Sequence, residues 1–555
     1  MFQLRKYLVK PTVAVCLALG STSAMAYLPT NNDDGAVTVY WGGATASTQS
    51  AMELTVTAVC ASDTHILYVP AGGTAANPKR PGNDWAVACN TSLAKTGLPD
   101  GTRVLVVKRD RGGSGVGVGP VQTKGDGSDA NVGRITFLDV SSVTCPAAAV
   151  GTPGVNGAPA ITNPAGGLEP LQECAATYNQ SRYTEMGTSD IEPDKFFGTN
   201  VNEPNVDGAG LPFRTETDRA FAERSTLAGL AFNTPITLAL RNVLQTEQFL
   251  ATNVCNPAHP SYNLLTDDLT DRADATNAES QACMPSLTRS EIASMMTGTV
   301  VNWNQLLRAN NTPILPAGLP IQICRRVAGS GTQATINALI MGWPGDPGST
   351  IDIALPRTPN TPVPGTVVGN SGSSDVDTCL HNFNATANPY AIGNLSVEGR
   401  NTDNLRNWRY IKIDGLAPTL ANIHGGNTYM WAQQSCQRRN NSLPYNPGSA
   451  PATDTVLNKT RVYTALCGTA ASNGLNNFGA LALLNNNAVY TWGQSGWLAS
   501  PTAAASNVAD AVLNIARPVN MFTRDAQNLV LNILQVPRKA TAGANAGRGM
   551  IVVGP

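Results

Sequence analysis

Three stretches of the sequence share one pattern, in which an apolar strand leads into a glycine-rich turn and then into a further element. They run over residues 37–59, 103–115 and 321–341. Strands that alternate with helices are typical of parallel sheets covered by helices on both faces, and such folds bind ligands beyond the carboxyl ends of their strands. The pattern therefore predicts an α/β fold and makes the three turns candidates for a ligand site.

The third stretch carries the most specific chemistry. Ile321 and Ile323 alternate as in a strand, and Ser330 then opens a segment with apolar residues at helical spacing. Free backbone amides at a helix start, the hydroxyls of Ser330 and Thr332 and the guanidinium of Arg326 together suit a tetrahedral oxyanion. An ordinary strand-to-helix turn is the alternative that this loop alone leaves open.

Thr45 and Ser114 occupy the corresponding turns of the first two stretches. Glycine-rich turns are common, so a purely structural turn is the alternative for each of them. Two nucleotide-binding motifs can be excluded. The run Gly113–Gly119 lacks the spacing of a dinucleotide-binding loop and is followed by Pro120, and no glycine-lysine-serine or glycine-lysine-threonine ending of a P-loop follows these glycines.

Asp190 is the carboxylate of greatest interest. A carboxylate that faces a bound anion repels it, unless the ligand carries a proton that it can donate to the carboxylate. Hydrogen phosphate has such a proton at neutral pH and sulfate does not, so one aspartate can accept the first ion and reject the second. The alternative is a helix-capping role for Asp190 before Ile191.

Enzyme and metal motifs are missing from the sequence. The four histidines have no acid or cysteine partners at motif spacing, and no G-x-S-x-G or H-E-x-x-H sequence occurs. The acidic clusters at 126–129 and 267–274 do not follow the EF-hand pattern. We therefore expect no catalytic residues, no metal and no cofactor, and we interpret the histidines as structural: His65, His259, His381 and His424.

The N-terminus predicts export. Basic residues precede the apolar run 13–19, and small residues at Ala24 and Ala26 fit a signal-peptidase site, so residues 1–26 form a predicted signal peptide and Tyr27 the mature start. No later stretch reaches the roughly 18 apolar residues that a membrane span needs. We expect a protein of the periplasm, or one that is secreted or on the cell surface, and that does not span the membrane.

Ten cysteines remain once Cys16 leaves with the signal peptide, and an even number in an oxidising compartment favours disulfides. Pairing neighbours along the chain would close five loops, although sequence alone does not fix the connectivity. No pair has the CxxC spacing of a zinc or thioredoxin-like site. The ten are Cys60, Cys89, Cys145, Cys174, Cys255, Cys283, Cys324, Cys379, Cys436 and Cys467.

The charge balance excludes some partners. The formal net charge is −1 and charged residues make up 14% of the 555-residue chain, with no basic stripe. Nucleic acid and anionic membrane surfaces are therefore not expected as partners. We expect the protein to be a monomer. A loop-rich insertion is predicted at about 118–186, because residues 146–170 have a loop composition.

One block of the sequence resembles a known family. Residues 284–341, which read MPSLTRSEIASMMTGTVVNWNQLL and then LPIQICRRVAGSGTQATINALIM, are similar to the phosphate-binding proteins of bacterial ABC importers. GGSG at 112–115 and GTSDIEP at 187–193 support the resemblance. It implies a type II periplasmic binding protein fold, in which two doubly wound lobes joined by a hinge close on a dehydrated phosphate, with an ABC permease as a possible partner.

The resemblance also implies site residues and domain boundaries. Lobe 1 would comprise residues 27–234 and 399–555, the latter including a C-terminal tail, and lobe 2 would comprise residues 235–398. Thr45 would lie in the first anion loop and Ser114 in the second, and Asp190 would accept the ligand's proton. The far wall would be formed by Arg326, Ser330, Gly331 and Thr332.

Two departures from the family pattern stand out. Ala328 replaces an aspartate that the family often has in this loop, which predicts a less firmly oriented Arg326, and Ala46 replaces a bulky residue.

The main hypothesis is an exported protein that captures phosphate, or a similar oxyanion, for ABC import. The alternative is a secreted surface or matrix protein that retains the binding-protein fold. Phosphatase activity is a third possibility, for which the sequence supplies no nucleophile.

Overall fold

The computed structural model describes a defined part of the chain. The predicted signal peptide, Ala328, His424, both acidic clusters and residues 146–170 lie outside it. The described residues are 28–32, 34, 36–62, 64–70, 83–122, 134–145, 171–175, 177–191, 193–196, 221–262, 282–307, 311–327, 329–341, 366–396, 407–418, 430–441, 445–446, 453–467, 497–498 and 551–552.

The larger of two main sheets contains ten strands within the described residues. Their order is β16-β9-β19-β8-β1-β4-β3-β2-β6, and β20 pairs with β9. Strand β1 is parallel to both β4 and β8, which places their carboxyl ends at the same edge. The strands are β1 (Val37–Gly42), β2 (Ile66–Pro70), β3 (Asp84–Asn90), β4 (Arg103–Arg109), β6 (Leu171–Cys174), β8 (Met186–Ser189), β9 (Phe221–Asn233), β16 (Leu395–Ser396), β19 (Trp431–Arg439) and β20 (Trp497–Leu498).

The smaller sheet has the order β14-β13-β15-β10-β17, and β13 is parallel to both of its neighbours. Its strands are β10 (Ile236–Thr237), β13 (Gln322–Arg326), β14 (Val367–Asn370), β15 (Ala391–Gly393) and β17 (Trp408–Arg409). Three strand pairs complete the described strands. They are β5 (Arg134–Phe137) with β7 (Gln180–Tyr183), β11 (Ser286–Leu287) with β18 (Lys412–Ile413), and β12 (Leu306–Leu307) with β21 (Ile551–Val552).

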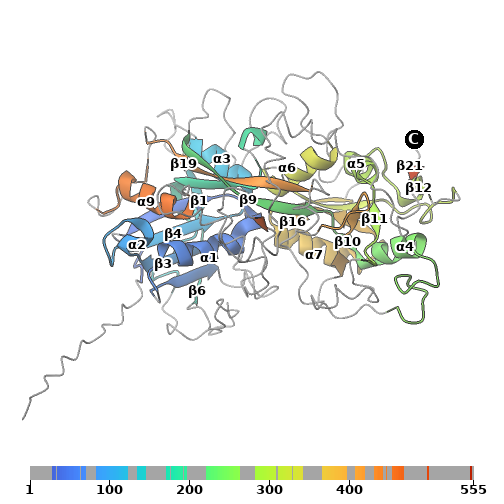
Figure 1. Ribbon diagram of the computed structural model, residues 1–555. Helices are drawn as coiled ribbons and strands as arrows, with labels where there is room; N and C mark the ends of the chain where they lie inside the picture. Colours follow the sequence, from blue (N-terminus) through green and yellow to red (C-terminus); the bar gives the residue numbers. More distant parts are fainter. Residues whose placement is uncertain are drawn as a thin grey trace, which may run out of the picture.

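Helices cover both sheets. In Figure 1, α1, α2 and α9 lie with the larger sheet at one end of the molecule, α4, α5 and α7 lie at the other end, and the long strand β9 runs between them. The helices are α1 (Thr48–Val59), α2 (Leu93–Thr96), α3 (Ser114–Gln122), α4 (Leu238–Gln248), α5 (Arg289–Thr297), α6 (Gly331–Ile336), α7 (Ser373–Phe383) and α9 (Val456–Cys467), with short turns η1 (Thr45–Ser47), η3 (Pro193–Phe196) and η5 (Trp303–Gln305) and the π-helix η6 (Asn337–Met341).

Strand β1 explains why the larger sheet is buried on both faces. Val39 and Trp41 face the core that contains α1 and α9, whereas Tyr40 faces the opposite core and packs on Phe137 with ring centroids 5.0 Å apart. Successive side chains of a strand point to opposite faces, so an unbroken apolar run such as that of β1 fits a sheet that is covered on both sides.

The α/β fold predicted from the sequence is confirmed, and the three strand-turn-helix stretches form β1 to α1, β4 to α3, and β13 to α6. The expectation of parallel sheets holds only in part, because the larger sheet is mixed: β3 runs antiparallel to β2 and to β4. A parallel return needs a long crossover, and the described link between β3 and β4 contains only the four-residue helix α2.

The ten cysteines after the predicted signal peptide form disulfides between neighbours in the sequence, as predicted. Their sequence separations run from 28 to 55 residues. Each bond lowers the conformational entropy of the unfolded chain, which stabilises the folded state by about 3–4 kcal/mol. The bond between Cys324 and Cys379 ties β13 to α7, two elements that also build the site described below.

Candidate functional site

The first predicted loop follows β1 and bends sharply. Gly43 has φ of 93° and Ala44 has φ of 63°, after which Thr45 begins η1 and lies buried at 4% exposure. A Cβ at Gly43 would stand 2.3 Å from the carbonyl oxygen of Thr188, so only glycine fits there. The turn directs Thr45 away from the sheet and toward the third loop.

The second loop places Ser114 at the start of α3, where it is fully buried. The hydroxyl oxygen of Ser114 accepts a hydrogen bond of 2.9 Å from the backbone N–H of Asp190, which directly follows β8. Because β8 and β4 both flank β1 in parallel, Asp190 and Ser114 meet at the same edge of the sheet. These two predicted residues are therefore direct neighbours.

Asp190 is fully buried, yet neither of its carboxylate oxygens has a hydrogen-bond partner within the protein. Burial raises the pKa of Asp190 to about 6, and the positive charge of Arg326, the nearby hydroxyl of Ser114 and the positive charge of Lys108 oppose that rise. An unpaired buried carboxylate is costly. Such a group therefore points to a ligand that can donate a proton to it.

The third loop follows β13. Ser330 caps α6, since its hydroxyl oxygen accepts from the backbone N–H of Gln333 at 3.3 Å. The hydroxyl of Thr332 is buried and has no hydrogen-bond partner within the protein, like the carboxylate of Asp190. A helix start with a free hydroxyl is suited to hold an anion.

Arg326 lies at the end of β13 and is fully buried. Its Nε donates to the carbonyl oxygen of Asn370 at 3.2 Å, and its Nη2 donates to that of Ser371 at 2.8 Å. Its Nη1 reaches the hydroxyls of Ser373 at 3.3 Å and Thr45 at 3.0 Å. Burial lowers the pKa of Arg326 to about 10, so the guanidinium stays positively charged at neutral pH.

The turn that holds Arg326 is itself ordered by Asp375. The carboxylate of Asp375 accepts from the hydroxyl of Ser371 at 2.5 Å and from the backbone N–H of Gly372 at 2.8 Å. The expected looseness of Arg326 beside Ala328 is therefore not observed. Carbonyl groups between β14 and α7 orient the guanidinium in place of a neighbouring aspartate.

The loops of the two sheets touch one another directly. The backbone N–H of Gly115 donates to the carbonyl oxygen of Gly329 at 2.8 Å. A Cβ at Gly331 would stand 2.1 Å from the hydroxyl oxygen of Ser114 and 2.7 Å from the Cβ of Asp190. The structure thus brings all seven predicted residues into one cluster: Thr45, Ser114, Asp190, Arg326, Ser330, Gly331 and Thr332.

Two buried charges beside this cluster were not identified from the sequence. Lys108 and Asp110 form an ion pair whose side chains are both 0% exposed. Lys108 also donates to the carbonyl oxygen of Gly43 in the first loop. The available signal was the segment VLVVKRD, in which charged residues directly extend a fully apolar strand.

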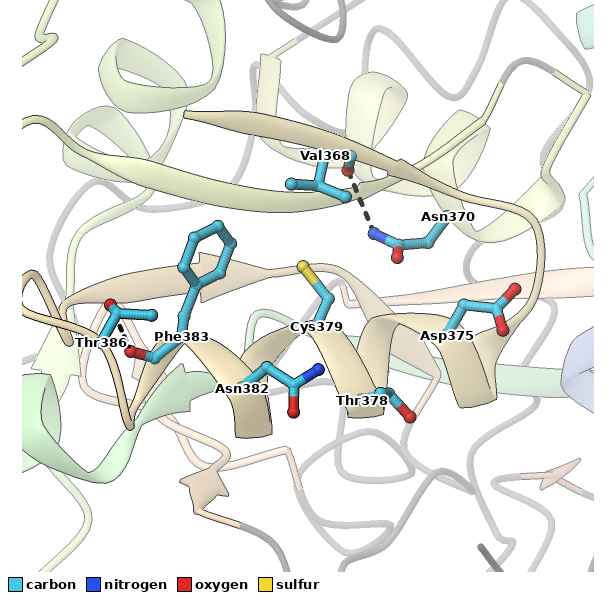
Figure 2. Close-up of a pocket in the computed structure, with 8 residues that line it drawn as sticks. All are labelled: Val368, Asn370, Asp375, Thr378, Cys379, Asn382, Phe383 and Thr386. Carbon is cyan, nitrogen blue, oxygen red and sulfur yellow. Dashed lines mark hydrogen bonds between the residues drawn. The ribbon is translucent and has the colours of Figure 1, made fainter. Parts of the chain in front are cut away.

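A separate cavity of about 450 Å³ lies along α7. Figure 2 shows Asn370 and Asp375 at one end of it and Phe383 and Thr386 at the other. None of the seven predicted residues lines this cavity. It borders the back of the turn that holds Arg326, because Asn370 and Asp375 belong to both.

The described residues give no sign of a metal or membrane site. No group of three or more histidine, cysteine, aspartate or glutamate side chains within them is arranged to hold a metal ion. Among the described helices, none has the length and apolar character to cross a bilayer. Trp303 is buried and donates from Nε1 to the carbonyl oxygen of Tyr390 at 3.2 Å, which is a structural role.

Comparison with known proteins gives only distant likenesses. No protein-family model matches the chain, and no curated protein matches it. Among solved structures, a protein assigned as a phosphate ABC transporter substrate-binding protein from Clostridium perfringens, with bound phosphate, is 12% identical at a TM-score of 0.33, covering 80% of this chain and 97% of its own.

Two further solved structures are similar. An ABC-type phosphate transport receptor from Vibrio cholerae is 14% identical at a TM-score of 0.24, covering 51% of this chain and 78% of its own. PstS from Borrelia burgdorferi is 12% identical at a TM-score of 0.26, covering 56% of this chain and 86% of its own. With TM-scores below 0.5, these likenesses do not establish a family, and the function is inferred below from the residues themselves.

Proposed function

We propose that this chain is an exported solute-binding protein that captures hydrogen phosphate, or a similar protonated tetrahedral oxyanion, between the loops of its two sheets. One observation carries the proposal. The two carboxylate oxygens of Asp190 and the hydroxyl of Thr332 are buried without partners, beside the buried guanidinium of Arg326. Together these groups offer a positive charge, a hydroxyl and a proton acceptor to one small ion.

The charges favour a ligand that is both an anion and a proton donor. Arg326 attracts an oxyanion by its positive charge, and its four hydrogen bonds within the protein leave one of its five N–H groups to donate to that oxyanion. Asp190 repels an anion unless that anion donates a proton to one of its oxygens, which hydrogen phosphate does and sulfate does not. The hydroxyls of Thr45 and Thr332 and the backbone amides near Gly331 are suited to the remaining ligand oxygens.

Titration calorimetry with phosphate and with sulfate at pH 8 and low ionic strength tests the proposal. We expect phosphate to bind and sulfate to bind far more weakly. Substituting Arg326→Ala should weaken phosphate binding at least about tenfold, because hydrogen bonds to charged groups contribute roughly 1.5–3 kcal/mol. If neither ion binds the wild-type protein, the proposal fails.

Asp190→Asn separates the proton-acceptor role from a general effect on the fold. We expect this variant to lose about tenfold or more in phosphate affinity and to bind sulfate better than the wild type does, since the neutral amide no longer repels it. Asp454→Asn is the matched control, because the side chain of Asp454 is only 5% exposed but interacts with Lys459, away from the anion loops. An unchanged ratio of phosphate to sulfate affinity in Asp190→Asn would rule out the role.

Delivery of the ion to an ABC permease is the second part of the proposal. The predicted signal peptide, the five disulfides and the absence of a spanning helix among the described residues fit an exported protein. Cell fractionation tests location, and phosphate uptake by cells that lack the protein tests transport. If the protein lies on the outer surface or in the matrix, and phosphate uptake is unchanged by its loss, the alternative is favoured. The chain would then be a surface or matrix protein that retains the binding-protein fold.

A further inference from the structure

Two buried charges flank the carboxyl end of β4, the strand that leads to the second loop. Lys108 and Asp110 are both 0% exposed and their side chains pair directly. Lys108 also lies over the ring of Trp41, with Nζ 4.7 Å from the ring centroid. Burying two charges is costly unless further hydrogen bonds compensate it, so the partners of this pair indicate what it holds in place.

Lys108 holds the first loop. Its ammonium donates to the carbonyl oxygen of Gly43, which also accepts from the hydroxyl of Thr188 at 3.1 Å. Gly43 and Ala44 are the two residues with positive φ that turn the chain toward Thr45. A left-handed alanine is unfavourable by itself, so the conformation depends on contacts such as these.

Asp110 joins the first loop to the second. Its carboxylate accepts from the hydroxyl of Thr48 at 2.7 Å and from the indole N–H of Trp85 at 3.2 Å. Thr48 donates as well to the carbonyl oxygen of Thr45 at 3.0 Å. On the other side, the backbone carbonyl of Asp110 accepts from the N–H of Gly113 at 2.9 Å, one residue before Ser114.

We propose that Lys108 and Asp110 are positioning and specificity-determining residues of the anion site, which fix the first loop around Thr45 and act on Asp190 through their charges. The inference rests on the proposed function. It goes beyond it because neither residue belongs to the seven that would contact the ion.

The charges of Lys108 and Asp110 shift the pKa of Asp190 in opposite directions. The charged groups that act on Asp190 are Arg326 of β13, Lys108 of β4 and Asp110, which directly follows β4. The positive charge of Lys108 lowers the pKa of Asp190, whereas the negative charge of Asp110 raises it. Loss of Lys108 alone therefore makes Asp190 take up a proton at higher pH, and loss of Asp110 as well partly reverses that change.

Lys108→Met is the test variant, because methionine is similar in length to lysine but carries no charge and donates no hydrogen bond. Lys108→Met with Asp110→Asn removes both charges and avoids leaving an unpaired buried carboxylate, so it carries the test if the single variant does not fold. Lys459→Met is the matched control. Lys459 is a buried lysine paired with Glu185 at 2.7 Å, at the other end of the larger sheet's central strands.

Two measurements follow. Hydrogen exchange without any anion should show residues 43–48 exchanging at least about tenfold faster in Lys108→Met than in the wild type, because a charged donor to Gly43 is lost. Calorimetry from pH 5 to pH 8 should show about tenfold weaker phosphate binding. Sulfate binding should begin at a higher pH in Lys108→Met and return toward the wild-type pH in the double variant.

The control and the possible failures are separable. Lys459→Met should lower thermal stability while leaving exchange at 43–48 and the pH of sulfate binding unchanged. Folded Lys108 variants with wild-type exchange and a wild-type pH profile would overturn the inference, as would the same changes in Lys459→Met. If the wild-type protein binds neither phosphate nor sulfate, the proposed function and the specificity role fail together, whereas the exchange result still decides whether the pair fixes the first loop.

Discussion

Asp190 is the residue on which discrimination between ions depends. A carboxylate next to an anion site opposes binding of every anion, and it is tolerated only when the intended ligand supplies a proton. Its two oxygens are buried without partners, whereas its backbone N–H is bonded to Ser114. The bond to Ser114 therefore fixes the backbone of Asp190, and the carboxylate oxygens are left for a ligand.

The first prediction concerns pH. Burial raises the pKa of Asp190 to about 6. Above that pH the carboxylate is ionised and excludes sulfate. Below it the protonated group can donate to sulfate, so the ratio of phosphate to sulfate affinity should fall as the pH drops from 8 to 5. Calorimetry across this range measures the ratio.

The Asp190→Asn variant provides the control, because its selectivity should be low and nearly independent of pH. A wild-type ratio that stays constant from pH 8 to pH 5 would contradict the assignment of selectivity to the ionisation of this residue.

At Arg326, the sequence predicts the anion-binding loop but not the groups that orient the side chain. An arginine followed by glycine, serine and threonine at a strand end could be recognised as an anion-binding loop. The groups that orient its guanidinium could not, because two of them are backbone carbonyls of Asn370 and Ser371. A carbonyl belongs to every residue, so no sequence pattern identifies one that lies 45 positions away and points at an arginine.

At the scale of elements, the contact between α6 and the second loop decides whether the two sheets can approach each other. Gly331 begins α6, and a Cβ there would meet the hydroxyl oxygen of Ser114 at 2.1 Å and the Cβ of Asp190 at 2.7 Å. Cβ contacts under about 3 Å do not occur in folded proteins, so one of the two loops would have to move away.

Gly331→Ala is therefore expected to weaken phosphate binding strongly, by about a hundredfold or more, while costing little stability. Alanine is favoured over glycine within a helix by about 1 kcal/mol, which offsets other losses when the loops are apart. Calorimetry and thermal melts of the anion-free variant measure the two effects.

Gly101→Ala is the comparison for this variant. Gly101 has a positive φ of 79° but open space around it, so alanine should lower stability and leave binding intact. Full phosphate affinity in Gly331→Ala would show that this approach of the loops is not required.

Helix α3 is an element that its own sequence does not predict. Its sequence, SGVGVGPVQ, contains three glycines and an internal proline, and such residues disfavour a helix. Tertiary packing overrides that preference. A Cβ at Gly117 would stand 2.2 Å from the carbonyl oxygen of Thr188 and 2.7 Å from that of Gly42, so the glycine lets the helix lie directly on β1 and β8. Helix α5, by contrast, can be recognised from the sequence, because its capping box of Thr288 and Glu291 is local.

Several carboxyl groups across the molecule are buried, and burial raises their pKa values. Burial raises the pKa of Asp84 and of Glu291 to about 7, and that of Asp190 and of Asp454 to about 6. Each of these groups binds its proton more tightly in the folded protein than in the unfolded chain. Folding is therefore coupled to proton uptake, and this contribution to stability must increase as the pH falls.

The last prediction is a melting temperature that rises by a few degrees between pH 8 and pH 5.5 in the absence of anion. The rise in melting temperature should begin as the pH falls through about 7, where Asp84 and Glu291 take up protons. It should continue as the pH falls through about 6. It should level off near pH 4, where carboxyl groups of the unfolded chain are protonated as well.

Glu291→Gln identifies one contributor to this slope. The amide keeps an oxygen for the capping contacts with Thr288 but does not ionise, so the variant should melt with a shallower pH dependence than the wild type. Scanning calorimetry at several pH values measures both proteins. Because raised pKa values add stability on acidification, a melting temperature that falls from pH 8 to pH 5.5 with the same slope in the wild type and in Glu291→Gln would contradict a raised pKa of Glu291.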